Sequence, residues 1–160
     1  MSDFAQSWEL SRKRFVDEIA SLNDKQLRWR SHPGSLSIGE MALHVAGVET
    51  SFSAQLAGMS LDDFGANLRR CATEGVVNEE AFPFATEQIN SAMVTEALAY
   101  SLDLAGPLIR EASAEVRARE IKSALGPMIS GDGAFARLGF HAAYHQGQAY
   151  LMKTDPRFPR

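Results

Sequence analysis

The sequence predicts an all-α protein, a four-helix bundle with a long connection between its second and third helices. Three observations indicate this fold class: apolar residues recur at helical spacing in four stretches, no stretch has the alternation of a half-buried strand, and no internal repeat divides the chain. With 160 residues, 45% of them hydrophobic and 22% charged, the chain has the size and composition of one domain spanning residues 1–160.

The first two helices are predicted from apolar stripes and from capping residues. The first stripe predicts a helix over roughly residues 3–22. Ser37 and Glu40 have the spacing of a capping box, so we expect the second helix to begin there and to end near Gly58. The stripes consist of Phe4, Trp8, Phe15, Ile19 and Leu22 in the first helix, and of Ile38, Met41, Val45, Val48, Phe52 and Leu56 in the second.

Two further helices are predicted in the second half of the chain. Thr86 can cap a third helix, but Pro107 lies inside its apolar pattern, so this helix either kinks there or ends near Ala105. A fourth helix is expected from about residue 130 to 153, because Pro156 prevents its continuation. The stripes are Ile89, Met93, Tyr100, Leu104 and Leu108 in the third helix, and Phe135, Leu138, Ala142, Ala149 and Met152 in the fourth.

The two long connections between helices have less regular patterns. Residues 59–85 are interpreted as an extended connection in which residues 61–70 can form a short helix. This connection is long enough for the second and third helices to run parallel, but its composition leaves parallel and antiparallel arrangements open. Residues 116–128 show no convincing period and are expected to form a loop.

Charge and hydropathy exclude several classes of partner. Sixteen basic residues against 20 acidic ones give a net charge of −4, so we expect no nucleic-acid partner. No secretory signal and no apolar run long enough for a membrane helix is present, so no membrane partner and a cytoplasmic location are expected. The single cysteine, Cys71, cannot form an internal disulfide. Its neighbours Arg69 and Arg70 could lower the pKa of its thiol, although a bystander thiol is the plainer interpretation.

Three of the four histidines fall on apolar helix faces. His141 and His145 lie one helical turn apart, and His44 lies on the apolar face of the second helix. A single buried histidine is usually a hydrogen-bonded core residue. Three buried imidazoles without partners would cost roughly 1–3 kcal/mol per unsatisfied group, whereas a divalent metal satisfies one nitrogen of each. Spacing alone leaves both interpretations open. His32, in a His-Pro-Gly turn, is expected at the surface.

Two segments resemble the DinB-like family of small metal-binding four-helix bundles. They are residues 37–49 (SIGEMALHVAGVE) and residues 141–148 (HAAYHQGQ), the second with an H-x-x-x-H-x-G-Q signature. Residues 22–34 are also similar to the family's link between its first two helices, whereas residues 59–85 and 112–129 contribute little.

The resemblance implies a metal triad of His44, His141 and His145, with one ligand from the second helix and two from the fourth. It also implies a range of activities. The superfamily includes transferases and isomerases that depend on bacillithiol or mycothiol, alongside damage-inducible proteins of unassigned chemistry.

Such a triad would leave the charge of a zinc, nickel, iron or manganese ion uncompensated and a coordination position open. A thiol would lose its proton there and could be transferred to an electrophile, and water could become a nucleophile for hydrolysis. The resemblance favours a thiol S-transferase with a low-molecular-weight thiol as cosubstrate and a small-molecule substrate. The alternatives are a non-catalytic metal-binding or stress-response module, a metal-dependent hydrolase, and a metal-free bundle that forms a homodimer.

Supporting residues are proposed for the metal ligands. Glu40 and Glu49 are alternative acceptors for the ring N–H of His44 that faces away from the metal. Gly147, inside the fourth helix, indicates a close approach by a neighbouring backbone.

Three further residues are candidates for a role in catalysis, each with a structural alternative. Gln148 could orient a water or substrate, or make a helix–helix contact. Arg137 could present charge to an anionic substrate, or be solvated. Tyr144 could donate a proton, or pack in the core.

Overall fold

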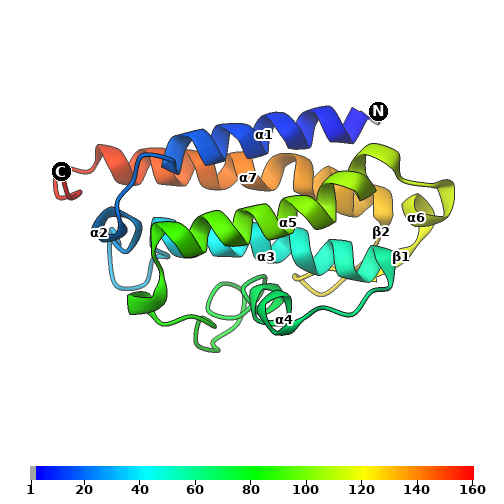
Figure 1. Cartoon of the computed structure of the whole chain (residues 1–160), viewed down its shortest axis with the longest axis horizontal. Helices are drawn as coiled ribbons and strands as arrows, with labels where there is room; N and C mark the ends of the chain where they lie inside the picture. The colour runs from blue at the N-terminus through cyan, green and yellow to red at the C-terminus, as the bar shows by residue number, and fades with distance from the viewer. Residues whose placement is uncertain (1–2) are drawn as a thin grey trace.

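Four long helices lie lengthwise against one another in the computed structural model, which describes residues 3–160 (Figure 1). Helix α1 packs along α7, and α3 packs along α5. Contacts of α3 with α7 and of α1 with α5 join the two pairs. The predicted all-α fold class is therefore confirmed. The long helices are α1 (Asp3–Ile19), α3 (Ile38–Ala57), α5 (Ser91–Glu111) and α7 (Gly131–Thr154).

Polar side chains cap the long helices. Ser37 and Glu40 form the predicted capping box of α3, in which each side chain accepts from the other residue's backbone N–H. Gly58 ends α3 with φ 64°, a left-handed conformation that favours glycine. Ser130 caps α7, which begins close to the predicted residue 130. Helix α5 begins later than expected, with Asn90 as its cap, because Thr86 opens the short 3-10 turn η1 (Thr86–Gln88) instead.

Helix α5 continues through Pro107 to Glu111, so the predicted alternative of an end near Ala105 is wrong. Proline removes one backbone donor from the helix. Buried residues on both sides of it, Ala105 and Ile109, hold the segment against the core, so the helix does not end near Ala105.

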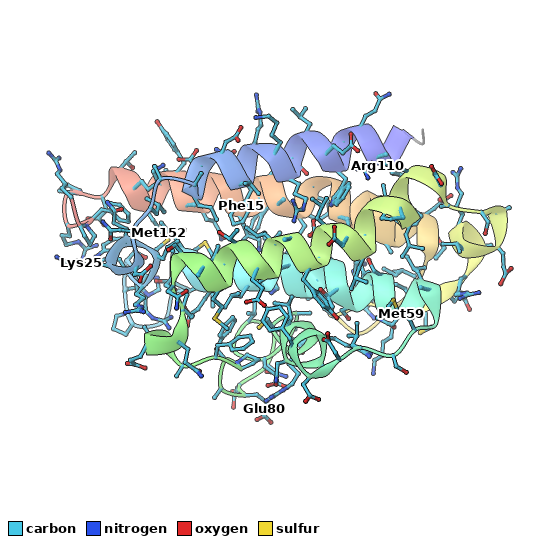
Figure 2. All side chains as sticks on the ribbon, viewed as in Figure 1. Phe15, Lys25, Met59, Glu80, Arg110 and Met152 are labelled. Carbon is cyan, nitrogen blue, oxygen red and sulfur yellow. The ribbon has the colours of Figure 1, made fainter. Side chains whose placement is uncertain are left out.

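A crossover from the end of α3 to the start of α5 makes these two helices parallel (Figure 1). The chain leaves α3 at one end of the molecule and returns along its flank to the other end before α5 begins. The crossover contains α4 (Asp63–Arg70), which packs on α3, and Glu80 lies at its outer edge (Figure 2). The prediction of a short helix within residues 61–70 is confirmed.

The expectation that the chain forms no strands is wrong at one place. Strands β1 (Glu120–Lys122) and β2 (Met128–Ser130) form an antiparallel hairpin after the short helix α6 (Ala114–Ala118). Each strand has three residues, too few for an alternating pattern to be recognised. Gln55 of α3 makes hydrogen bonds to both the backbone N–H and the carbonyl of Lys122, which ties the hairpin to the helical core.

Aromatic and aliphatic side chains fill the interior between the long helices. Phe15 of α1 is fully buried and points between them (Figure 2). A polar link lies within this core: the Glu49 carboxylate accepts from the indole N–H of Trp8, from the guanidinium of Arg12 and from the hydroxyl of Ser101. A further short helix, α2 (Asp24–Leu27), connects α1 to α3. None of the described helices is long and apolar enough to cross a membrane.

Candidate metal centre

Helices α3 and α7 bring three imidazole rings to one point. His44 comes from α3, and His141 and His145 come from successive turns of α7. Nε2 of His141 lies 3.1 Å from Nε2 of His44 and 3.2 Å from Nε2 of His145. One nitrogen of each ring lies within 4.8 Å of the other two. Because His44 and His145 are 5% exposed, the cluster is largely shielded from solvent.

Hydrogen bonds fix the orientation of two of these rings. Nδ1 of His44 lies 2.8 Å from the carbonyl oxygen of Cys71, and Nδ1 of His145 lies 2.7 Å from the amide oxygen of Gln148. Both oxygens can only accept, so both Nδ1 atoms carry a proton and donate it. The Nε2 atoms of His44 and His145 therefore each present a lone pair to the centre of the cluster.

The third ring is left with an unsatisfied nitrogen. Nδ1 of His141 is buried and has no hydrogen-bond partner among the described residues. A proton on Nε2 of His141 could serve only one of the two facing lone pairs well, and a proton on Nδ1 would leave three lone pairs facing one another. A divalent cation would accept all three. Zinc–nitrogen bonds of about 2.0–2.1 Å place two tetrahedral ligand atoms about 3.3 Å apart, close to the observed spacings, so these residues can hold a metal ion.

Burial keeps the three imidazoles in the neutral form that binds metals. It lowers the pKa of His141 to about 2, with added repulsion from His44 and His145. It lowers the pKa of His145 to about 4, against the opposing hydrogen bond to Gln148. The pKa of His44 is lowered by the same loss of solvation. At neutral pH no proton must be displaced before a cation binds.

Comparison with known proteins agrees with this fold. The model of the DinB superfamily matches residues 7–149. This chain belongs to the DinB superfamily. A crystal structure described as a conserved protein from Enterococcus faecalis is similar, with a TM-score of 0.64, 16% identity, and coverage of 92% of this chain and 91% of that one. At this identity the likeness shows the shared fold alone. No curated protein matches the chain.

Neither carboxylate predicted to support His44 reaches it in this DinB-superfamily chain. Glu40 accepts from the backbone N–H of Ser37 and pairs with Arg30. Glu49 points into the core, where it bonds Trp8 and Arg12. The backbone carbonyl of Cys71 is the acceptor for the ring N–H of His44 instead. Because every residue has such a carbonyl, the sequence contains no signal for this role.

The Cys71 thiol does not have the lowered pKa that its basic neighbours, Arg69 and Arg70, could have produced. Its side chain is fully buried, and burial raises its pKa to about 12, with a further contribution from the charge of Glu74. Arg70 acts in the opposite direction but does not outweigh burial. The thiol is therefore a structural group, and the residue contributes to the centre through its backbone.

The close backbone approach predicted at Gly147 is found at another glycine. Gly147 has open space around it. A Cβ on Gly47 of α3 would lie 2.5 Å from the carbonyl oxygen of Leu68 and 3.0 Å from Cβ of Cys71. Gly47 thus lets the end of α4 approach α3 closely enough for the Cys71 carbonyl to reach His44.

Two pockets open onto the histidines. The larger, of about 800 Å³, is lined by His44, His141 and His145, and by polar groups that include Ser35 and Gln148. The smaller, of about 350 Å³, is lined by His44, His141 and mostly apolar side chains. Leu125, from the hairpin turn, lines both pockets, so the hairpin helps to shape the site. Residues 116–128 carried no pattern that predicted this contribution.

The three catalytic candidates take different places around the histidines. Gln148 accepts from His145, so it orients an imidazole instead of a water or substrate. Tyr144 is 59% exposed, with its ring centroid 5.0 Å from that of His145, and it lines the larger pocket outside the core. Arg137 lines the smaller pocket.

Proposed function

We propose that this protein is a metal-dependent enzyme that transfers a low-molecular-weight thiol to a small electrophilic molecule. The observation that carries the proposal is the convergence of three neutral imidazole nitrogens from His44, His141 and His145 at pockets large enough for small molecules. A purely structural histidine cluster has no need of such access, whereas a site that binds substrates does.

Three neutral histidine ligands would leave a bound metal ion able to take up a substrate. When bound, a zinc, nickel, iron or manganese ion would supply an uncompensated positive charge and an open position, which lower the pKa of a thiol. Gln148 and the Cys71 carbonyl keep His145 and His44 in the tautomer that presents Nε2. Polar side chains in the wall of the larger pocket, among them Ser35 and Gln148, can bind a thiol that carries hydrogen-bonding groups.

The proposed reaction is a substitution at an electrophilic carbon. The sulfur of the thiol forms a bond to that carbon, and the leaving group departs with the electron pair of the bond that breaks. The proton of the thiol passes to solvent. The protein contributes by holding the two reactants beside one another, which replaces a bimolecular encounter by a reaction between bound groups.

Metal analysis of protein purified without an affinity tag or chelator tests the first half of the proposal. We expect close to one equivalent of a divalent transition metal in the unaltered protein and a loss of most of it in His44→Ala. His32→Ala, at an exposed histidine, is the matched control and should keep its metal. Less than about a tenth of an equivalent in the unaltered protein would contradict a resident metal.

Turnover with a panel of low-molecular-weight thiols and a chromogenic aryl halide tests the second half. We expect formation of the thioether to require the metal and to fall to the uncatalysed rate in His44→Ala. Full metal occupancy without reaction of any thiol in the panel would instead assign the protein to the non-catalytic metal-binding modules.

A further inference from the structure

The smaller pocket at the histidines differs in character from the larger one. Its walls are mainly apolar, with Val48 and Phe52 from α3, Leu125 from the hairpin turn and Phe140 from α7. Leu125 and Phe140 are 70% and 58% exposed, so large apolar groups stand uncovered at this pocket. Exposed apolar side chains gathered around a concave site are typical of a surface that binds an apolar ligand.

One charged side chain, Arg137, lies among these apolar groups. Its Nη1 donates to the hydroxyl of Ser123 at 2.7 Å. Ser123 is itself buried, and its backbone N–H donates to the carbonyl of Pro127, which closes the hairpin turn. The guanidinium is thus held against the pocket wall by a group that is part of a fixed turn.

Arg137 forms no ion pair with a carboxylate in the part of the chain that the structure describes. Many other arginines of the protein form ion pairs with carboxylates, but no ion pair within residues 3–160 involves Arg137. No acidic side chain of these residues lines the smaller pocket. A guanidinium is charged at every physiological pH and has five N–H donors, of which one is engaged here. The remaining donors can bind an anion beside the apolar walls.

The spacing of Arg137 and His141 on α7 sets the length of a ligand that could contact both side chains. Arg137 precedes His141 by four residues, which is about 6 Å along a helix axis. A compact molecule that bridges the two would carry its anionic group only a few bonds from the atom that faces the histidines.

We infer that the smaller pocket binds the electrophilic substrate, and that this substrate is a small apolar molecule with an anionic group, such as an aryl carboxylate, held by Arg137. The electrophilic character of the substrate rests on the proposed function. The binding of an amphiphilic anion depends only on the pocket and on Arg137. The larger pocket is then left for the polar thiol, so each reactant has its own entry to the histidines.

Isothermal titration of the full-length protein with 2-naphthoate, 2-naphthamide and acetate tests this inference. We expect 2-naphthoate to bind, its neutral amide to bind at least about tenfold more weakly, and acetate not to bind measurably. Arg137→Gln should weaken 2-naphthoate about tenfold or more and leave 2-naphthamide within about twofold. Arg14→Gln, the same change of charge at an exposed position on α1, is the control and should bind both ligands as the unaltered protein does.

A second variant tests the pocket itself. Ala124 is a half-buried residue of the hairpin loop that lines the smaller pocket and not the larger one. Ala124→Phe should weaken both naphthyl ligands, whereas Ala124→Ser should not. Equal affinity of 2-naphthoate for the unaltered protein and Arg137→Gln, or no effect of Ala124→Phe, would overturn the inference.

Repeating the titration on chelator-treated protein of measured metal content separates the two proposals. Binding of 2-naphthoate that disappears with the metal and ignores Arg137→Gln would mean that the anion binds the ion, which overturns the inference and leaves the proposed function standing. Arg137-dependent binding to a protein that never contains metal would support the pocket assignment and contradict the metal-dependent transfer.

Discussion

At the scale of single residues, the centre depends on which nitrogen of each histidine carries the proton. The carbonyl of Cys71 and the amide oxygen of Gln148 hold the protons of His44 and His145 on Nδ1. Burial removes the alternative of a charged imidazole by lowering the pKa of all three rings. The same burial lowers the stability of the protein in acid, because the unfolded chain can bind protons that the folded chain cannot.

This effect predicts how the metal-free protein responds to acid. The pKa of His145 is about 4 in the folded state, against an ordinary histidine value of 6.5. Between these values the unfolded chain binds a proton at this position and the folded chain does not, so the free energy of unfolding falls as the pH falls. Each such histidine contributes up to about 1.4 kcal/mol per pH unit.

Thermal melts in the presence of a chelator, from pH 7 to pH 5, measure this effect. His145→Gln should lose stability less steeply over that range than the unaltered protein. His32→Gln, at the exposed histidine, should have the slope of the unaltered protein. Identical slopes in all three proteins would contradict the assignment of a lowered pKa to His145.

Gln148 provides a second prediction at the same scale. Its amide oxygen accepts the proton of His145 Nδ1 at 2.7 Å, so Gln148→Ala should lower metal affinity about 10–100-fold through loss of ring orientation. Gln148→Glu, which keeps an acceptor, should retain most of the affinity. Competition with a chromogenic chelator measures it. On the same helix, Gln146 donates to Glu18 instead. Gln146→Ala is therefore expected to bind metal normally, and a loss of metal affinity there would argue against a specific role for Gln148.

At the scale of elements, the packing of one helix against another decides whether the centre can form. The end of α4 approaches α3 at Gly47, three residues after His44, and this approach delivers the Cys71 carbonyl. Helix α7 meets no comparable neighbour at Gly147, whose surroundings are open. Two helical glycines therefore have opposite expected responses to the same substitution.

Replacement of each glycine by alanine tests this contrast. Gly47→Ala should destabilise the protein and weaken metal binding, because the new Cβ would displace the backbone of Leu68 and with it Cys71. Gly147→Ala should raise the free energy of unfolding by roughly 0.5–1 kcal/mol, because alanine has the higher helix propensity and no clash results. Chemical denaturation and metal titration measure both. A stabilising Gly47→Ala would show that α3 and α4 are not in close contact.

At the scale of the whole molecule, buried polar groups connect helices that are far apart in the sequence. Arg12 of α1 and Glu49 of α3 form an ion pair with 10% and 3% of their side chains exposed, and Ser101 of α5 adds a hydrogen bond to the carboxylate. The network spans three of the four long helices. None of its hydrogen bonds within residues 3–160 involves a histidine, so its loss should affect stability and leave metal binding intact.

Glu49→Ala tests the whole-molecule role of this network. Removal of the carboxylate leaves the Arg12 guanidinium buried and uncompensated, so we expect the free energy of unfolding to fall by about 3–5 kcal/mol. The double change Arg12→Met with Glu49→Leu removes both charges and should cost less than Glu49→Ala alone. Urea denaturation measures the difference. A loss of metal from folded Glu49→Ala protein would contradict the separation of the network from the centre.

The sequence by itself determined the local features of this protein. The apolar stripes, the Ser37 capping box, the Gly58 terminator and the inward faces of His44, His141 and His145 all follow from side chains within a few residues of one another, where helical geometry sets the distances.

Only the tertiary structure decided what lies around those residues. The Cys71 carbonyl and the approach at Gly47 involve backbone atoms, which no residue type marks. The hairpin that holds Arg137 and shapes the smaller pocket has strands too short to show a period, and the parallel course of α3 and α5 depends on a crossover whose path is set by packing. Contacts of this kind join segments far apart in the chain, so their geometry arises only when the helices pack together.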